Sequence, residues 1–119
     1  MASSEELWSL LQAKVKEDRE ALTKRVKASF RFIIHESSGK VTHILNLKEE
    51  GGWISEGDDE ASVDATIEMK AEHFALLCLG KMSPQQAFMA GKLKIKGDIR
   101  ASMRLMPLIT RLDAKTSKL

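Results

Sequence analysis

The residues most able to do acid–base, nucleophilic or metal chemistry are the three histidines and the single cysteine. His35 is predicted to end a strand, His43 to lie within one and His73 to begin a helix. None of them has a second ligand at a metal-binding spacing. Cys78 lies in an apolar run, which favours the thiol over the reactive thiolate. The chain also lacks a nucleophile elbow and a glycine-rich phosphate loop. These residues favour a binding protein without metal or cofactor, although catalytic groups distant in sequence can meet in space.

Length and composition predict one globular domain. The chain has 119 residues, of which 43% are hydrophobic and 30% charged, a mixture typical of a folded protein. Its 19 Lys and Arg and 17 Asp and Glu give a net charge of +2, too balanced for a nucleic-acid-binding surface. A single cysteine excludes an internal disulfide and suits a reducing compartment. We therefore expect residues 1–119 to form a single domain.

The last three residues, Ser117, Lys118 and Leu119, match the tripeptide that the peroxisomal import receptor recognises. The first residues lack the basic and then apolar pattern of a secretory signal. The longest apolar run, residues 74–79, is far too short to cross a bilayer. We therefore expect synthesis in the cytosol, import into the peroxisome matrix, and a flexible targeting tail at about residues 112–119.

The N-terminal segment carries helix signals. Ser3 and Glu6 match a capping box, and apolar residues then recur at helical spacing up to Val15. The charged run of residues 16–20 predicts a break between two helices. A second, short helix is then expected at residues 19–24.

Five segments have features of strands, mostly an alternation of apolar and polar residues. They are residues 26–35, 41–48, 53–55, 63–69 and 92–97. Tight turns separate the first three, which predicts an antiparallel meander. The last strand directs its lysines to water, where they would also protect the edge of the sheet.

Three more helices are predicted in the second half of the chain. Residues 71–79 form the first, with a broad apolar surface. Ser83 caps a short second helix that Gly91 ends. Asp98 caps the last helix, which Pro107 should kink or end.

These later helices carry more apolar side chains than a small sheet needs to cover one face. Mostly apolar walls with a few polar groups are typical of a small-molecule site. A buried acyl chain would gain about 0.8 kcal/mol per methylene from such walls. The residues that could line a tunnel are Phe74, Leu77, Phe88, Met89, Met103, Met106, Leu108 and Ile109. The alternative is that these side chains simply pack against one another.

Residues 80–98, GKMSPQQAFMAGKLKIKGD, resemble the signature segment of the sterol carrier protein type 2 family. The resemblance rests on Gly-Lys-Met, Pro-Gln, Ala-Phe, Gly-Lys-Leu-Lys-Ile and a final Gly, in that order. Residues 63–69 are also similar to the family's strand before its paired helices. The order of elements fits across the whole chain, most closely in its second half. Ser83, where the family usually has Asn, and residues 106–108 depart from the pattern, and the second departure leaves ligand preference open.

The resemblance implies an α+β fold: a five-stranded mixed sheet with about five helices over one face, enclosing a hydrophobic tunnel. It also implies non-catalytic binding and transfer of fatty acids, fatty acyl-coenzyme A and sterols. By the same likeness Gln85 would lie at the cavity, where its amide could meet a head group; the alternative is an exposed position on its helix. The final helix would close the tunnel. The residues expected to contact ligand are Phe32, Leu45, Leu47, Trp53, Phe74, Leu77, Met82, Gln85, Phe88, Met89, Met103, Met106, Leu108 and Ile109.

Two other functions stay open at this point. The domain could be an interaction module whose apolar helical surface docks on a larger peroxisomal lipid-metabolising enzyme, since similar domains occur fused to such enzymes. It could also be an enzyme that processes acyl thioesters, which would need a histidine or carboxylate converging on a nucleophile. An enclosed cavity would favour the carrier, and an open apolar patch would favour the module. We expect a monomer with transient membrane contact and no nucleic-acid partner.

Overall fold

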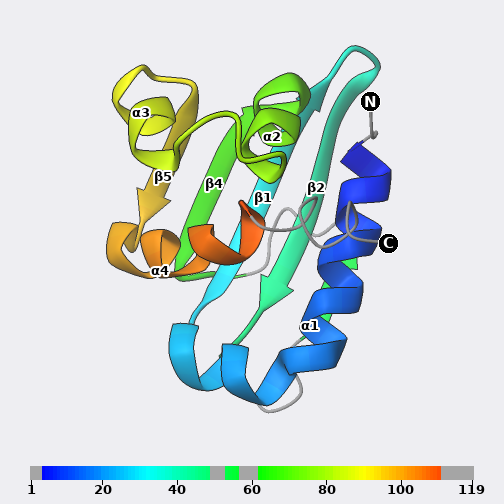
Figure 1. The fold of residues 1–119 in the computed structure, drawn as a ribbon, viewed down its shortest axis with the longest axis vertical. Coiled ribbons are helices and arrows are strands. Elements are labelled where there is room, and N and C mark those ends of the chain that lie inside the picture. The colour runs from blue at the N-terminus through cyan, green and yellow to red at the C-terminus, as the bar shows by residue number, and fades with distance from the viewer. Residues whose placement is uncertain (1–3, 49–52, 57–61, 111–119) are drawn as a thin grey trace.

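The computed structural model describes residues 4–48, 53–56 and 62–110 of the chain. Figure 1 shows a twisted sheet with helices packed against it. The strands are β1 (Ser29–Glu36), β2 (Gly39–Asn46), β3 (Trp53–Glu56), β4 (Ala65–Lys70) and β5 (Leu93–Gly97). The helices are α1 (Ser4–Val26), α2 (Ala71–Cys78), α3 (Pro84–Met89) and α4 (Ile99–Ile109).

The strands form one mixed sheet in the order β3-β2-β1-β4-β5. All neighbouring strands are antiparallel except β1 and β4, which are parallel. Strands β1, β2 and β3 form the predicted meander, and β4 joins the other side of β1. The single α+β domain expected from the sequence is therefore confirmed.

The alternation along the strands determines which face of the sheet is apolar. In β1, Phe30, Phe32 and Ile34 are fully buried, whereas Arg31 and His35 belong to the opposite face. Strands β4 and β5 repeat this alternation of buried and accessible residues. One face of the sheet therefore packs on helices, and the other carries polar and charged side chains.

Helices α1, α2 and α4 cover the apolar face, and α3 lies beside β5 at the edge of the sheet (Figure 1). Helix α2 buries Phe74, Leu77 and Cys78. Helix α4 buries Leu105 and Met106 on its sheet-facing side. The core is thus a single layer between the sheet and three of the helices.

Helix α1 is continuous from Ser4 to Val26, so the predicted break at residues 16–20 is wrong. Val15, Leu22 and Val26 are all buried, which keeps the apolar stripe in phase on both sides of the charged run. Lysine and glutamate also favour the helical state. Lys16, Glu17 and Glu20 of the charged run are exposed, and the run does not interrupt the helix. The expected second helix is the last part of α1.

The predicted caps of two later helices are confirmed. The side chain of Ser83 accepts a hydrogen bond from a backbone N–H in the first turn of α3, and Asp98 does the same for α4. Helix α4 continues through Pro107 to Ile109, so the proline does not end it. Burial of Met106 and Ile109 holds this last turn against the core.

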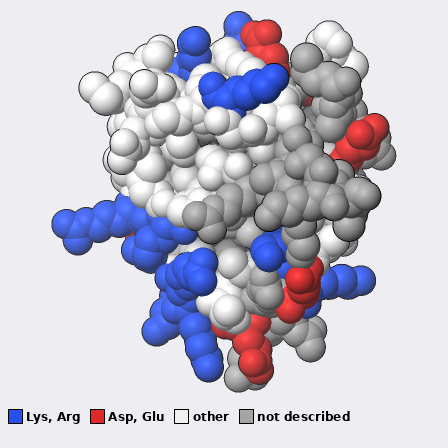
Figure 2. Space-filling model, viewed as in Figure 1, with Lys and Arg blue, Asp and Glu red and all other residues white. Residues whose placement is uncertain are grey.

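Basic side chains gather where α1 ends and α4 begins, as Figure 2 shows for one face of the molecule. Exposed cations of these two segments are Lys24, Arg25, Arg100 and Arg104, which we call the basic end. Arg104 Nη2 donates a hydrogen bond to the carbonyl of Val26 at 2.9 Å and so joins the two helices. None of the described helices is long and apolar enough to cross a membrane.

Candidate functional site

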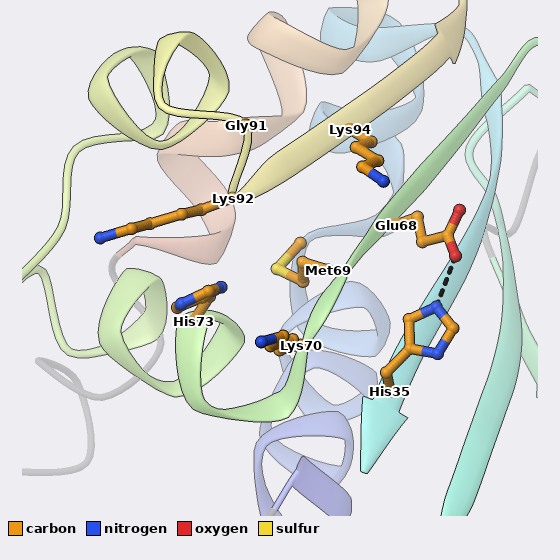
Figure 3. Close-up of a pocket in the computed structure, with 8 residues that line it drawn as sticks. All are labelled: His35, Glu68, Met69, Lys70, His73, Gly91, Lys92 and Lys94. Carbon is orange, nitrogen blue, oxygen red and sulfur yellow. Dashed lines mark hydrogen bonds and ion pairs between the residues drawn. The ribbon is translucent and has the colours of Figure 1, made fainter.

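A groove opens at the end of the sheet where β1 and β4 finish and β5 begins (Figure 3). Its volume of about 730 Å³ lies within the usual range of small-molecule sites. We call this groove, lined by the following residues, the edge groove: His35, Glu68, Met69, Lys70, His73, Gly91, Lys92 and Lys94.

His35 and Glu68 form an ion pair on one side of the edge groove, marked by the dashed line in Figure 3. The hydrogen bond that Nε2 of His35 donates lowers the pKa of the Glu68 carboxyl, and the nearby charges of Lys94 and Lys96 lower it further. Glu68 is therefore ionised at neutral pH, and its charge is engaged by these neighbours.

Lys70, His73 and Lys92 lie on the other side of the edge groove, away from Glu68 (Figure 3). Both lysines are exposed, and neither forms an ion pair with another described residue. Helix α2 begins here, and its N-cap, Lys70, makes no side-chain hydrogen bond to the first-turn N–H groups. This side of the groove therefore combines positive charge with uncapped backbone donors.

The His73 side chain is only 16% accessible. Its Nε2 lies 3.8 Å from a carboxylate oxygen of Glu72. Its Nδ1 is buried and has no hydrogen-bond partner within the described ranges. A buried polar atom without a partner is uncommon in folded proteins, which makes this nitrogen a candidate ligand contact.

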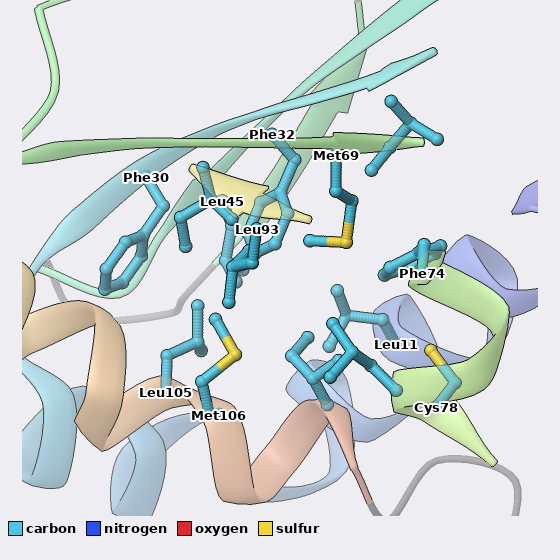
Figure 4. Close-up of a cluster of buried hydrophobic side chains, with 14 of the residues drawn as sticks. Leu11, Phe30, Phe32, Leu45, Met69, Phe74, Cys78, Leu93, Leu105 and Met106 are labelled. Carbon is cyan, nitrogen blue, oxygen red and sulfur yellow. The ribbon is translucent and has the colours of Figure 1, made fainter. Parts of the chain in front are cut away.

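An apolar layer fills the space between the sheet and helices α1, α2 and α4 (Figure 4). Strands β1 and β2 and all three helices contribute side chains to it. The layer, which we call the apolar interior, includes the fully buried residues Leu11, Phe30, Phe32, Leu45, Phe74 and Leu105. Its walls have the composition that a hydrocarbon ligand requires.

Trp8 lies within an aromatic cluster of the apolar interior. Its ring stacks on His43 at a centroid distance of 4.1 Å and on Phe74 at 5.2 Å, and it meets Phe32 edge-on at 5.0 Å. The indole Nε1 is buried without a hydrogen-bond partner in the described part of the chain. The sequence prediction omits Trp8, although its position about two helical turns before Val15 places both on one helix face.

The structure places many of the predicted ligand-contacting residues in or against the apolar interior. Those buried there are Phe32, Leu45, Leu47, Phe74, Leu77, Met106 and Ile109. Those partly buried against it are Met82, Met103 and Leu108. For Trp53 the structure describes only the backbone, in β3. Burial suits both core packing and ligand contact, so the enclosed tunnel stays a prediction.

The three predicted residues of α3 lie at the surface instead. Gln85, Phe88 and Met89 are exposed, and Met89 is 86% accessible. The reason is that α3 is a helix of six residues that buries Ala87 and turns its other side chains toward solvent. In this conformation α3 contributes Ala87 to the core, and the ligand contacts expected of Gln85, Phe88 and Met89 stay predictions.

Met69 joins the two regions. Its side chain is 3% accessible and belongs to the core, yet it also lines the edge groove. It pairs with Leu93 across β4 and β5. Met69 therefore lies at the boundary between the groove and the interior, and methionine is a flexible side chain.

The described residues contain no group of three His, Cys, Asp or Glu side chains able to hold a metal ion. Cys78 is fully buried on the core face of α2. The edge groove brings one histidine and one carboxylate together, and the residues that line it include no serine, threonine or cysteine. We refer to the edge groove and the apolar interior as the two candidate binding regions.

The sequence model of the SCP-2 sterol transfer family matches residues 8–110. The chain belongs to this family. The match begins at Trp8 in α1 and ends just after α4, so it includes both binding regions. The family expected from residues 80–98 is therefore confirmed.

The alignments with relatives cover very different shares of the relative's length. It is 34% identical over 116 residues to non-specific lipid-transfer protein-like 1 of Caenorhabditis elegans, covering 97% of this chain and 94% of the relative. It is 35% identical over 92 residues to hydroxysteroid dehydrogenase-like protein 2 of Homo sapiens, covering 76% of this chain and 22% of the relative. The chain thus spans about a fifth of the length of the dehydrogenase-like relatives.

Solved structures share the fold. The sterol carrier protein domain 2 of Helicoverpa armigera superposes with a TM-score of 0.73 and 26% identity, covering 89% of this chain and 84% of that one. Sterol carrier protein 2 of Aedes aegypti, solved in complex with palmitate, superposes with a TM-score of 0.65 and 20% identity. It covers 84% of this chain and 91% of that one, and the likeness extends to the fold alone.

Proposed function

We propose that this SCP-2 domain is a non-catalytic carrier that binds a long-chain lipid in the apolar interior and transfers it. Fatty acids, fatty acyl-coenzyme A and sterols are the proposed ligands. The observation that carries this proposal is the continuous layer of buried apolar side chains between the sheet and three helices (Figure 4). At about 0.8 kcal/mol per methylene, a sixteen-carbon chain gains at most about 12 kcal/mol there, before the costs of ordering and association.

Entry of a lipid requires the side chains of the apolar interior to separate. Met82, Met103 and Met106 pack in or against this layer, and methionine adapts readily to a new neighbour. Pro107 lacks the N–H that would bond to the preceding turn of α4, which weakens the end of that helix. We therefore assign α4 as the element that moves to admit the ligand while the sheet stays fixed.

Two relatives support a lipid ligand. The Caenorhabditis elegans protein is named as lipid-transfer protein-like, and the alignment covers nearly all of both chains. The Aedes aegypti protein of the same fold was solved with palmitate. Palmitate is therefore the first ligand to test with this chain.

Binding of a fluorescent long-chain fatty acid to the delipidated chain tests the carrier function. We expect saturable binding of one ligand per chain that palmitate displaces. Displacement by palmitoyl-coenzyme A or by a sterol ranks the other proposed ligands. The ligand should also raise the unfolding temperature, because it binds the folded state. A folded protein without displaceable binding would contradict the carrier function.

Exposed apolar side chains favour a second function, docking on a larger lipid-metabolising enzyme. Phe88, Met89 and Ile99 are 36%, 86% and 44% accessible. In the dehydrogenase-like relatives the matched segment is about a fifth of a longer protein. Binding to the dehydrogenase region of such a relative, weakened by Met89→Ser, would support docking. Equal binding by both forms would count against it.

We propose the peroxisome matrix as the location of this domain and residues 1–119 as its extent. The tripeptide Ser117, Lys118 and Leu119 and the expected tail at residues 112–119 lie outside the described residues. A fluorescent protein fused ahead of the chain should accumulate in peroxisomes, and removal of the tripeptide should leave it in the cytosol. An unchanged distribution would contradict the targeting prediction.

A further inference from the structure

The edge groove sets cationic groups near the apolar interior, and Met69 belongs to both regions. We propose that the edge groove binds the phosphate-bearing head group of a lipid whose hydrocarbon chain passes Met69 into the apolar interior. The site assigned to the phosphate is formed by Lys70, His73 and Lys92 (Figure 3). This inference rests on the carrier function proposed above and adds the residues that hold the head group.

The charge of the edge groove favours an anion. Lys70, Lys92 and Lys94 line it together with a single carboxylate, Glu68. That carboxylate accepts a hydrogen bond from His35, and Lys94 extends toward it in Figure 3. The charges of Lys70 and Lys92 on the other side have no ion-pair partner among the described residues. A phosphate there would form charge-assisted hydrogen bonds without displacing an existing ion pair.

The beginning of α2 supplies hydrogen-bond donors to the same place. Its N-cap, Lys70, makes no side-chain cap, so the first-turn N–H groups and the positive end of the helix dipole remain available. His73 lies in this first turn, and its buried Nδ1 lacks a partner in the described part of the chain. With a proton on Nδ1, this nitrogen donates to the phosphate, while Nε2 lies 3.8 Å from a carboxylate oxygen of Glu72. The unpartnered nitrogen and the uncapped helix are observations independent of the lysine charges.

The dimensions of the edge groove favour a phosphorylated group over a bare carboxylate. A volume of about 730 Å³ exceeds what a single carboxylate occupies. A phosphate monoester carries about −1.5 to −2 charges at pH 7, which matches the two lysines better than one negative charge does. Gly91 has a φ of 76° and nothing within 4 Å of the position of a side chain, so the backbone beside Lys92 is open to a ligand.

Two lipids with the same sixteen-carbon chain, one with a phosphate and one without, distinguish binding of the head group from binding of the chain. We would titrate the delipidated full-length chain with 1-palmitoyl lysophosphatidic acid and with hexadecanol, both below their micelle concentrations. The Lys70→Gln/Lys92→Gln variant should bind lysophosphatidic acid about tenfold more weakly, because two charge-assisted contacts are lost. Its affinity for hexadecanol should not change.

The matched control removes two charges from the basic end. Lys24→Gln/Arg25→Gln has the same change of net charge, but these residues lie at the end of α1, away from the edge groove (Figure 1). It should bind both lipids as the wild type does. Equal losses of lysophosphatidic acid binding in the two double variants would show that the net charge of the protein alone causes the weaker binding. That result would overturn the inference.

The remaining outcomes are also decisive. If the wild type binds both lipids and Lys70→Gln/Lys92→Gln binds them unchanged, the head-group site is wrong and the carrier function stands. If the folded wild type binds neither lipid, the carrier function fails and the inference fails with it. Circular dichroism of each variant verifies folding, and these exposed lysines should have little effect on it.

The histidine ring signals in nitrogen-15 NMR spectra locate the phosphate and identify its source. Addition of lysophosphatidic acid should shift the ring nitrogens of His73 and leave those of His43, which stacks on Trp8, much less affected. Inorganic phosphate at millimolar concentration should reproduce the shift only weakly if the site takes lipid head groups. An equally strong response to inorganic phosphate would overturn the lipid assignment, and an unshifted His73 would overturn the site.

Discussion

The apolar interior and the edge groove differ in what holds each of them together. The interior consists of side chains such as Phe30 and Phe74 that are removed from water, so the same contacts stabilise the fold and form the chain site. Three of the eight residues that line the edge groove are exposed lysines, and exposed charges add little to folding stability. Folding stability and the proposed head-group preference therefore depend on different residues of this domain. Substitutions should therefore alter them separately.

Truncation of a phenylalanine in the apolar interior should have the largest effect. Phe74 is fully buried, so Phe74→Ala should lower the free energy of unfolding by about 3–5 kcal/mol through lost burial and a cavity. The matched control is Phe88→Ala, whose side chain is 36% accessible and should cost much less. Urea unfolding of both variants measures the difference. Similar losses would mean that α3 is packed into the core in solution.

Loss of a helix cap should have an intermediate effect on stability. We compare the cap of α4, which covers the apolar interior, with the cap of α3, which lies at the edge of the sheet. Asp98→Ala removes the hydrogen bond of 2.9 Å to the Ala101 N–H at the start of α4, at a cost of about 1 kcal/mol. Because α4 is the proposed entrance, we also expect faster association of palmitate in stopped-flow experiments.

The matched cap is Ser83 of α3, whose hydrogen bond to the Gln86 N–H is longer, at 3.4 Å. Ser83→Ala should reduce stability less and should leave the palmitate association rate unchanged. Faster association in both variants would show that entry does not depend on α4 in particular.

Neutralising Glu68 should have a smaller effect with a defined pH dependence. The pKa of Glu68 is lowered from its ordinary value of 4.5, first by the hydrogen bond from His35. The ionised form therefore stabilises the folded state above about pH 4.5, and this contribution is lost as the pH falls through the lowered pKa. Glu68→Gln should reduce stability at pH 7 by less than about 1 kcal/mol and flatten the acid limb of the stability profile.

The same variant tests the edge groove. Removal of this negative charge should strengthen lysophosphatidic acid binding by about two- to threefold and leave hexadecanol binding unchanged.

Glu72→Gln, in which the replaced side chain is 70% accessible, is the control for the acid-unfolding profile, because it also removes one acidic residue. An identical acid limb in both variants would show that the pair of Glu68 with His35 does not contribute.

The smallest effect is expected at Met89, which is 86% accessible. Met89→Ser should change stability by no more than about 0.5 kcal/mol and should not alter palmitate affinity. Calorimetric titration measures the affinity. A loss of affinity greater than about threefold would show that α3 closes over the ligand, as the sequence predicted.

Periodicity predicts the regions in which one face of an element is buried. The alternation in residues 26–35 correctly places Phe30, Phe32 and Ile34 in the core, because strand geometry requires it. The break predicted in α1 fails for a related reason. Val15 and Leu22 stay buried on one face of α1, and the charged run between them does not interrupt the helix.

The edge groove could not be predicted in the same way. Lys92 and Lys94 are correctly assigned to the exposed side of β5, but sequence spacing does not bring them near Lys70 and His73. That proximity depends on the parallel pairing of β1 with β4 and the antiparallel pairing of β4 with β5. The resemblance of residues 80–98 predicted the family. It did not predict the surface position of Met89, which depends on how the short α3 packs beside β5.

Quenching of Trp8 by a brominated fatty acid tests directly whether an acyl chain occupies the apolar interior. Trp8 lies between His43 and Phe74, and the Trp53→Phe variant leaves it as the single tryptophan. Bromine quenches indole fluorescence only near contact. Titration of this variant with 9,10-dibromostearate should quench Trp8 with saturation at one ligand per chain, and palmitate should reverse it. Saturable binding that leaves Trp8 unquenched would place the acyl chain elsewhere and contradict the account.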